Sequence, residues 1–213
     1  MNSASHIHHS DFQNPFCTRR IRPGAAPYCF PSGVTAEDLV ERLRENRWRG
    51  EIVGPHGSGK STLLARIIPA IEQAGRQAVL FELHDGQRRL PGDWRRKIES
   101  PPSSPPPIAV IDGYEQISRW SRFLLKRYCN RRCFGLLVTS HVPAGFPEIF
   151  HTSASLEMAR QIVDQLMQNE KINISAEIIA DLFARHDGDI RELLFDLYDL
   201  YEEKMRVENA GGM

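Results

Sequence analysis

A glycine-rich loop constrains this sequence more than any other feature. The segment from Gly54 to Thr62 reads Gly-Pro-His-Gly-Ser-Gly-Lys-Ser-Thr and fits the spacing G-x-x-x-x-G-K-S/T. Glycines let the backbone turn tightly and bring its N–H groups close to an anion. A lysine at this position reaches the β- and γ-phosphates of a nucleotide, and the hydroxyl that follows it is a ligand for Mg²⁺. The loop therefore predicts a nucleoside triphosphate site with contacts from Gly54, Pro55, His56, Gly57, Ser58, Gly59, Lys60, Ser61 and Thr62.

The residues on both sides of the loop support this interpretation. Residues 51–53 are the end of a short apolar strand, and residues 63–71 carry apolar side chains at helical spacing. Gly75 is a plausible end for that helix. A phosphate-binding loop requires a strand before it and a helix after it. The alternative, a chance glycine-rich turn, requires neither.

The overall composition excludes few classes of protein. The chain has 213 residues, 41% of them hydrophobic, and its net charge is zero. This balance is unlike that of a strongly basic nucleic-acid binder, although it allows a local basic patch. No apolar run is long enough to span a bilayer, and the first nine residues form no secretory signal, so we expect a cytoplasmic protein.

The four cysteines leave two alternatives open. In a cytoplasmic chain, Cys17, Cys29, Cys129 and Cys133 are expected to be reduced thiols. A zinc site is conceivable, but Cys129 and Cys133 lack the usual spacing of a zinc-binding pair.

Apolar runs and helical patterns alternate along the chain. Further strands are expected at 78–82, at 108–111 and at 135–139, with a short last strand near 149–152. Alternation of this kind predicts an α/β fold, a parallel sheet in a three-layer α/β/α arrangement. The first expected helix begins after Thr35 and runs to about Asn46, and a short one covers 94–98. Another contains Ile117, Trp120, Phe123, Leu124 and Tyr128. The last three are expected at 156–167, 176–185 and 190–205.

The same pattern suggests a division into domains. Residues 1–13 are expected to form a disordered tail and residues 14–153 the core with the glycine loop. The all-helical residues 154–208 are expected to form a C-terminal lid, followed by a short tail at 209–213.

Polar side chains at the ends of two predicted strands complete a candidate site. Ligands of open α/β sheets bind at the carboxyl ends of the strands. Asp112 ends one apolar strand and could hold Mg²⁺ opposite Ser61, or simply cap the next helix. Glu115 could be the general base for water, or an acidic residue in a first helical turn. Ser140, after Thr139, could contact the γ-phosphate or the attacking water, or belong to a plain turn.

Taken together, these motifs resemble those of P-loop NTPases of the additional-strand division, with the glycine loop as Walker A. The segment Gly188-Asp189-Ile190-Arg191 is similar to the second sensor motif of AAA+ ATPases, and Asn14-Pro15-Phe16 resembles the adenine-side segment of secretion- and transposition-associated members. The resemblance implies that Arg191 contacts the γ-phosphate and that Thr139 or Ser140 is the first sensor.

Gly113 departs from the commonest form of this family. The catalytic glutamate of such proteins usually follows the Mg²⁺-binding aspartate directly, but here Gly113 does, and Glu115 comes later. The order Asp-Gly-x-Glu resembles signalling NTPases of the STAND type, in which hydrolysis is not necessarily rapid. No arginine finger can be assigned, so oligomer formation is possible but unsupported.

The sequence thus predicts an ATP-binding, Mg²⁺-dependent, AAA+-like ATPase that acts on an unidentified protein or nucleic-acid partner. A small-molecule kinase is one alternative, with Arg95, Arg96, Lys97, Arg131 or Arg132 at a second-substrate site, although such runs more often form solvated faces. A nucleotide-gated binding module with little turnover is another.

Overall fold

The computed structural model describes residues 14–25, 28–84, 86–100, 104–168, 170 and 172–211. The chain forms two compact units. The core unit is continuous from Pro27 to Ser153, whereas the helical unit combines Met1–Ala26 with Ala154–Met213.

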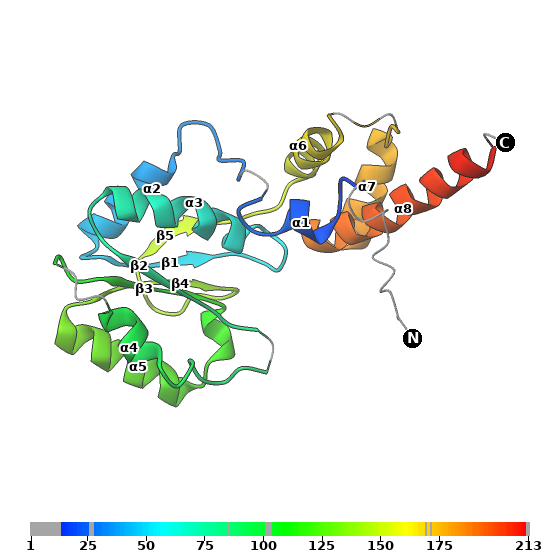
Figure 1. Ribbon diagram of the computed structural model, residues 1–213. Helices are drawn as coiled ribbons and strands as arrows, with labels where there is room; N and C mark the ends of the chain where they lie inside the picture. Colours follow the sequence, from blue (N-terminus) through cyan, green and yellow to red (C-terminus); the bar gives the residue numbers. More distant parts are fainter. Residues whose placement is uncertain are drawn as a thin grey trace, which may run out of the picture. The chain divides into compact units, whose positions relative to one another are not determined.

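A five-stranded, entirely parallel sheet lies at the centre of the core unit (Figure 1). Its spatial order is β2-β3-β4-β1-β5. The α/β fold with a parallel sheet, predicted from the alternating pattern, is confirmed. The strands are β1 (Arg49–Val53), β2 (Ala78–Glu82), β3 (Ile108–Asp112), β4 (Gly135–Ser140) and β5 (Glu148–His151).

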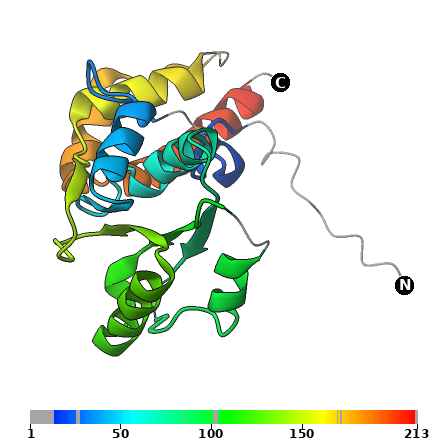
Figure 2. The ribbon, with the colours of Figure 1, turned by 90° about the vertical axis from the view of Figure 1, so that its left-hand side faces the viewer.

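Helices cover both faces of this sheet (Figures 1 and 2). One face packs against α2 (Ala36–Glu45) and α3 (Lys60–Gln73), and the other against α4 (Trp94–Glu99) and α5 (Arg119–Arg132). Successive strand residues alternate between the two cores, because side chains of a strand point to opposite faces. Ile108 and Val110 belong to the first core, and Ala109 and Ile111 to the second.

The first helix of the core unit begins where the sequence predicted. The Thr35 hydroxyl accepts a hydrogen bond from the Asp38 N–H at 3.2 Å, and the Asp38 carboxylate accepts one from the Thr35 N–H at 2.9 Å. This reciprocal capping satisfies two N–H groups that the helix itself leaves unpaired.

Helix α5 contains four of the five residues predicted for it, namely Trp120, Phe123, Leu124 and Tyr128. The side chains that it buries against the sheet are those of Leu125 and Cys129. Trp120 is 68% exposed and Phe123 is 53% exposed, so these two rings lie away from the core. Ile117 is buried but precedes the helix, which starts at Arg119.

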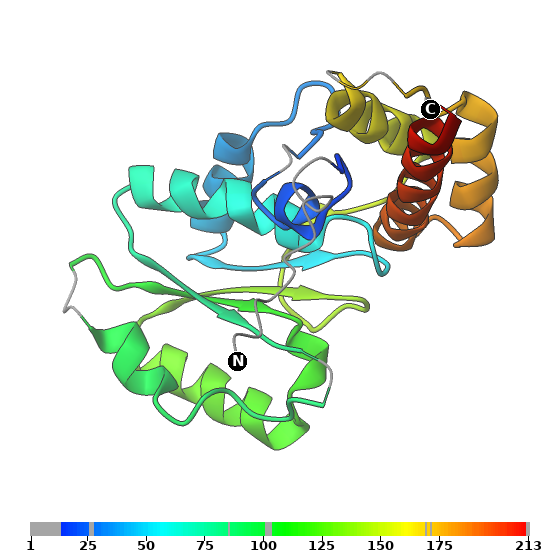
Figure 3. The ribbon, with the colours of Figure 1, turned by 45° about the vertical axis from the view of Figure 1, so that its right-hand side comes forward.

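The helical unit contains α1 (Thr18–Ile21), α6 (Leu156–Met167), α7 (Ala176–Arg185) and α8 (Ile190–Gly211) (Figure 3). The three helices predicted for this region are confirmed. Helix α8 runs on to Gly211, beyond the end near residue 205 that the pattern predicted, and includes residues 209–211 of the predicted tail. Residues 212–213 and the tail predicted at 1–13 lie outside the described residues. Among the helices of the described ranges, none is long and apolar enough to cross a membrane.

The N-terminal segment belongs to the helical unit, whereas the sequence-based division placed it with the core. Phe16 is 1% exposed and makes an edge-on contact with Tyr201 of α8, their ring centroids lying 6.3 Å apart. The buried Asn14 amide donates to the Tyr198 carbonyl at 3.1 Å and to the Glu202 carboxylate at 2.9 Å. The segment that was expected beside adenine is therefore anchored on the last helix.

We expect Asn14→Ala to lower the free energy of unfolding of the helical unit by about 1–2 kcal/mol, because it removes hydrogen bonds made by a buried amide. Thermal and denaturant unfolding followed by circular dichroism would measure the change. Asn173→Ala is the matched control, since that side chain is exposed. Equal stability of the two variants would contradict an anchoring role for Asn14.

Candidate functional site

The glycine-rich loop connects β1 to α3 at the carboxyl edge of the sheet. Gly57 and Gly59 have φ angles of 63° and 85°, in the left-handed region that favours glycine. The first hydrogen bond of α3 runs from the Leu63 N–H to the Gly59 carbonyl at 2.8 Å. The loop therefore leads directly into the N-terminus of a helix, where the helix dipole suits an anion.

Lys60, the first residue of α3, turns back toward the loop. Its side chain is largely buried, and the ammonium group donates to the Gly54 carbonyl at 2.7 Å and to the Pro55 carbonyl at 2.6 Å. The same nitrogen lies 3.3 Å from Nδ1 of His141. A positive charge is thus held within the loop, where the sequence predicted a phosphate contact.

Thr152 braces the loop from the end of β5. Its hydroxyl lies 2.7 Å from the Ser58 hydroxyl, and its N–H donates to the Val53 carbonyl at 2.8 Å. A Cβ atom at Gly54 would lie 2.1 Å from the Thr152 hydroxyl oxygen and 2.4 Å from its carbonyl oxygen. Only glycine fits at this position without displacing the backbone of Thr152, just after β5.

We therefore expect Gly54→Ala to lower the free energy of unfolding of the core unit by about 2 kcal/mol, as overpacking against backbone does elsewhere. The control is Gly92→Ala, because a Cβ atom at Gly92 would meet nothing within 4 Å. Denaturant unfolding of both variants measures the difference. A Gly54→Ala protein as stable as Gly92→Ala would show that Thr152 does not brace the loop.

Asp112 lies at the end of β3, which is separated from β1 by β4. Its Oδ1 accepts a hydrogen bond from the Thr139 hydroxyl at 2.5 Å, and that hydroxyl oxygen accepts one from the Gly113 N–H at 3.0 Å. Thr139 is fully buried and orients the Asp112 carboxylate through this bond. At the usual strand spacing, the backbones of β1 and β3 are about 10 Å apart.

Gly113 allows the chain to turn sharply between Asp112 and Glu115. Its φ angle is 81°, and a Cβ atom there would lie 3.0 Å from the Leu83 carbonyl oxygen. The chain then turns through the 3₁₀ segment η2 (Tyr114–Gln116). This turn carries Glu115 back toward the end of β4.

Glu115 and His141 form the contact that links the two halves of the site. Nε2 of His141 lies 2.9 Å from Oε1 of Glu115, while Nδ1 of the same ring lies 3.3 Å from the Lys60 ammonium. The second oxygen of Glu115, Oε2, is buried and has no hydrogen-bond partner among the described residues. The ring of His141 also lies against that of His56 in the loop, with centroids 3.5 Å apart.

The protonation state of His141 follows from these neighbours. Burial and then the Lys60 ammonium lower the pKa of His141, against the opposite effect of Glu115. A neutral ring with its hydrogen on Nε2 donates to Glu115 and accepts from Lys60. As the pH falls below the usual pKa of histidine, His141 binds a proton more readily in the unfolded protein than in the folded one. The folded state is therefore more stable at neutral pH, and this contribution of His141 is lost as the pH falls.

His141 is the residue that the sequence analysis passed over, although it directly follows Ser140. The Ser140 hydroxyl donates to the Val142 carbonyl at 2.7 Å, which is the contact of a strand-end turn. Glu51 holds the next part of this connection, since its buried carboxylate accepts from the Ala144 N–H at 2.7 Å and from the Phe146 N–H at 3.3 Å. A phosphate or water contact for Ser140 stays a prediction.

Arg191 lies in the helical unit, in the first turn of α8, and its side chain is exposed. Asp189 caps this helix by accepting from the N–H groups of Arg191 and Glu192 at 2.9 and 3.2 Å. Gly188 has a φ angle of 83°. The motif is therefore a well-formed helix start, and the sensor role of Arg191 stays a prediction.

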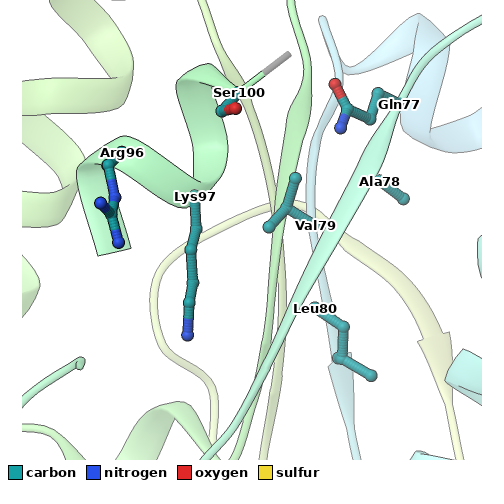
Figure 4. A pocket seen from close by; sticks show the side chains of 7 residues that line it. All are labelled: Gln77, Ala78, Val79, Leu80, Arg96, Lys97 and Ser100. Carbon is teal, nitrogen blue, oxygen red and sulfur yellow. The ribbon is translucent and has the colours of Figure 1, made fainter. Parts of the chain in front are cut away.

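Other features of the core unit lie apart from this constellation. A cavity of about 620 Å³ follows the edge strand β2, lined on its other side by Arg96, Lys97 and Ser100 (Figure 4). The three cysteines of the core unit are free, as is Cys17 of the helical unit. Within the described ranges, no three histidine, cysteine or acidic side chains gather as a metal site would require.

Comparison with known proteins adds no assignment. No protein-family model matches this chain, and no curated protein matches it in sequence.

Proposed function

We propose that this protein binds ATP with Mg²⁺ and hydrolyses it, as its resemblance to AAA+-like P-loop NTPases implies. One observation carries the proposal. His141 connects Lys60, at the end of the glycine-rich loop, to Glu115, which follows Asp112 in the sequence. A candidate phosphate-binding cation and a candidate general base therefore contact the same imidazole ring.

The strand order supports this proposal. The glycine loop follows β1, Asp112 ends β3, and β4 lies between them. This is the arrangement for which the additional-strand division of P-loop NTPases is named. The carboxyl ends of parallel strands are also where open α/β sheets bind their ligands.

The residues of the loop fit a triphosphate. The backbone of the loop, the N-terminus of α3 and the Lys60 ammonium would hold the phosphates, and Ser61 would hold Mg²⁺ together with Asp112. The two strands are far enough apart for Asp112 to act through a water. When bound, Mg²⁺ would neutralise charge on the phosphates and orient them.

Glu115 is suited to orient the attacking water. The His141 ring fixes one carboxylate oxygen, and the buried second oxygen, Oε2, retains its capacity to accept a proton. Ser140 and Arg191 complete the proposed set, Arg191 as the group in the helical unit that distinguishes ATP from ADP.

ATP binding measured by calorimetry and phosphate release measured with and without Mg²⁺ would test this function. Binding followed by multiple turnovers in the absence of any acceptor is the expected result. Turnover only with a small-molecule acceptor would identify a kinase instead. Tight binding without turnover would identify a nucleotide-gated module, and no binding would overturn the proposal.

Asp112→Asn is expected to weaken Mg²⁺-dependent ATP binding by about tenfold, because an amide is a poorer ligand for Mg²⁺ and for its bound water. Binding without Mg²⁺ should change little. Asp181→Asn, at an exposed position of α7, is the matched control. Equal losses with and without Mg²⁺ would remove Asp112 from the metal site.

A further inference from the structure

Helix α5 carries an exposed stripe of aromatic and basic side chains, which we call the α5 stripe. Arg119, Phe123, Arg127 and Arg131 follow one another at intervals of four residues, and Trp120 lies beside the first two. All five are exposed. Residues four apart lie on one face of a helix, and the stripe is about 18 Å long.

The two aromatic residues form one exposed aromatic surface, which we call the platform. The rings of Trp120 and Phe123 are stacked, with centroids 5.7 Å apart and an interplanar angle of 28°. Exposure of two large aromatic rings to water is energetically unfavourable, and contiguous exposed apolar surface commonly marks an interaction site. The core does not account for this pair, because Leu125 and Cys129 supply the buried face of α5.

The charge around the platform is strongly positive. Helix α5 contains six lysines and arginines and no acidic residue. Residues 27–153 together have 18 lysines and arginines against 13 aspartates and glutamates, a net charge of +5 that the zero charge of the whole chain conceals. The rest of the sequence carries the compensating charge of −5.

A cavity of about 680 Å³ opens beside the start of the stripe. Arg88, Arg119, Trp120 and Arg122 line it, and Glu115 is its one acidic lining residue. Within the described part of the chain, neither Arg88 nor Arg119 forms an ion pair, so both are available to an anion. Arg122 is held in place by donating to the carbonyls of Ile117 and Glu115 at 2.9 and 2.8 Å.

We propose that the α5 stripe binds single-stranded nucleic acid. Proteins that bind single strands without sequence preference combine cations along the phosphates with aromatic side chains on which bases stack. Arg119, Arg127 and Arg131 provide the cations, and the ring pair provides the platform. This inference goes beyond the nucleotide site and does not depend on ATP binding.

The aromatic pair favours a nucleic acid over an acidic protein segment. The carboxylates of an acidic protein segment would pair with the arginines but would make no stacking contact with the two rings. Unpaired bases present flat faces that match these rings, whereas the bases of a duplex are stacked on one another. The stripe therefore suits a single strand better than either alternative.

The test is fluorescence anisotropy of a short labelled oligothymidylate with the full-length protein and no nucleoside triphosphate present. Trp120→Ala and Phe123→Ala are each expected to weaken binding roughly 5- to 150-fold, the range for loss of one stacked base. With three phosphate contacts, a plot of log affinity against log salt should have a slope of roughly −2, which Arg127→Gln should reduce by about 0.7.

Two matched variants control for general effects of these substitutions. Phe195→Ala removes an exposed aromatic ring from the helical unit, and Arg44→Gln removes an exposed cation from α2. Both should bind the oligonucleotide as the unaltered protein does, and so should Lys60→Ala, whether or not the ATP site is correct. Circular dichroism checks that each variant is folded.

Three results would overturn the proposal. Equal affinity for an abasic strand of the same length would show that the rings do not stack on bases. Tighter binding of duplex DNA would assign the stripe to backbone recognition alone. A polyglutamate peptide that competes fully, with Trp120→Ala and Phe123→Ala unaffected, would identify an acidic protein partner.

Discussion

Replacing Lys60 with alanine is expected to weaken ATP binding roughly 10- to 150-fold. The range corresponds to the loss of charge-assisted hydrogen bonds from an ammonium group to phosphate oxygens. In the described structure, that ammonium is largely buried and bonded to the carbonyls of Gly54 and Pro55. The group is thus already held at the loop before any phosphate arrives. Titration calorimetry with ATP would measure the change.

Lys97→Ala is the control for Lys60→Ala, since Lys97 is exposed on α4 and paired with Asp93. It should bind ATP as the unaltered protein does. A folded Lys60→Ala protein with undiminished affinity for ATP would refute the assignment of the loop as a phosphate site. It would leave the His141 contact with Glu115 as an internal feature of the fold.

Replacing Glu115 with glutamine is expected to slow phosphate release by a factor of roughly 10² to 10⁴, the usual contribution of a general base. The amide oxygen can still accept the hydrogen bond from His141, so the ring should stay in place. The amide cannot accept a proton from water, however. ATP affinity should therefore change little while turnover falls, which separate binding and single-turnover measurements would show.

Glu82→Gln is the matched control, because Glu82 is exposed at the end of β2, the edge strand of the same sheet. It should leave turnover unchanged. If Glu115→Gln also leaves turnover unchanged, Glu115 is only an acidic residue at the start of a turn. If the unaltered protein already shows no turnover, the nucleotide-gated module is the better description.

Much of the core unit could be predicted from the sequence because its signals are local. The runs at 108–111 and 135–139 are apolar throughout, as strands buried on both faces are, and both lie within confirmed strands. Thr35 predicted the start of α2 in the same way. The confirmed parallel sheet follows from the alternation of these strands with helices.

The features that were missed depend on contacts between distant residues. Trp120 and Phe123 fit a helical period as well as Leu125 and Cys129 do, and only the packed sheet shows which side of α5 is buried. His141 looked like part of a turn because its two partners are distant in sequence, Lys60 at the start of α3 and Glu115 in the turn after β3. The position directly after a polar strand end was the one signal available for it.

The placement of the N-terminal segment has a consequence for biosynthesis. The helical unit is formed by one segment before and one segment after the core unit in the sequence, so the core unit is an insertion within it. Asn14 donates to the carbonyl of Tyr198, a residue 184 positions later. Domains generally fold as units during synthesis, N-terminal parts first. Here the segment around Asn14 is synthesised long before its partner helix α8, so it can pack against that helix only after the inserted sheet has been made.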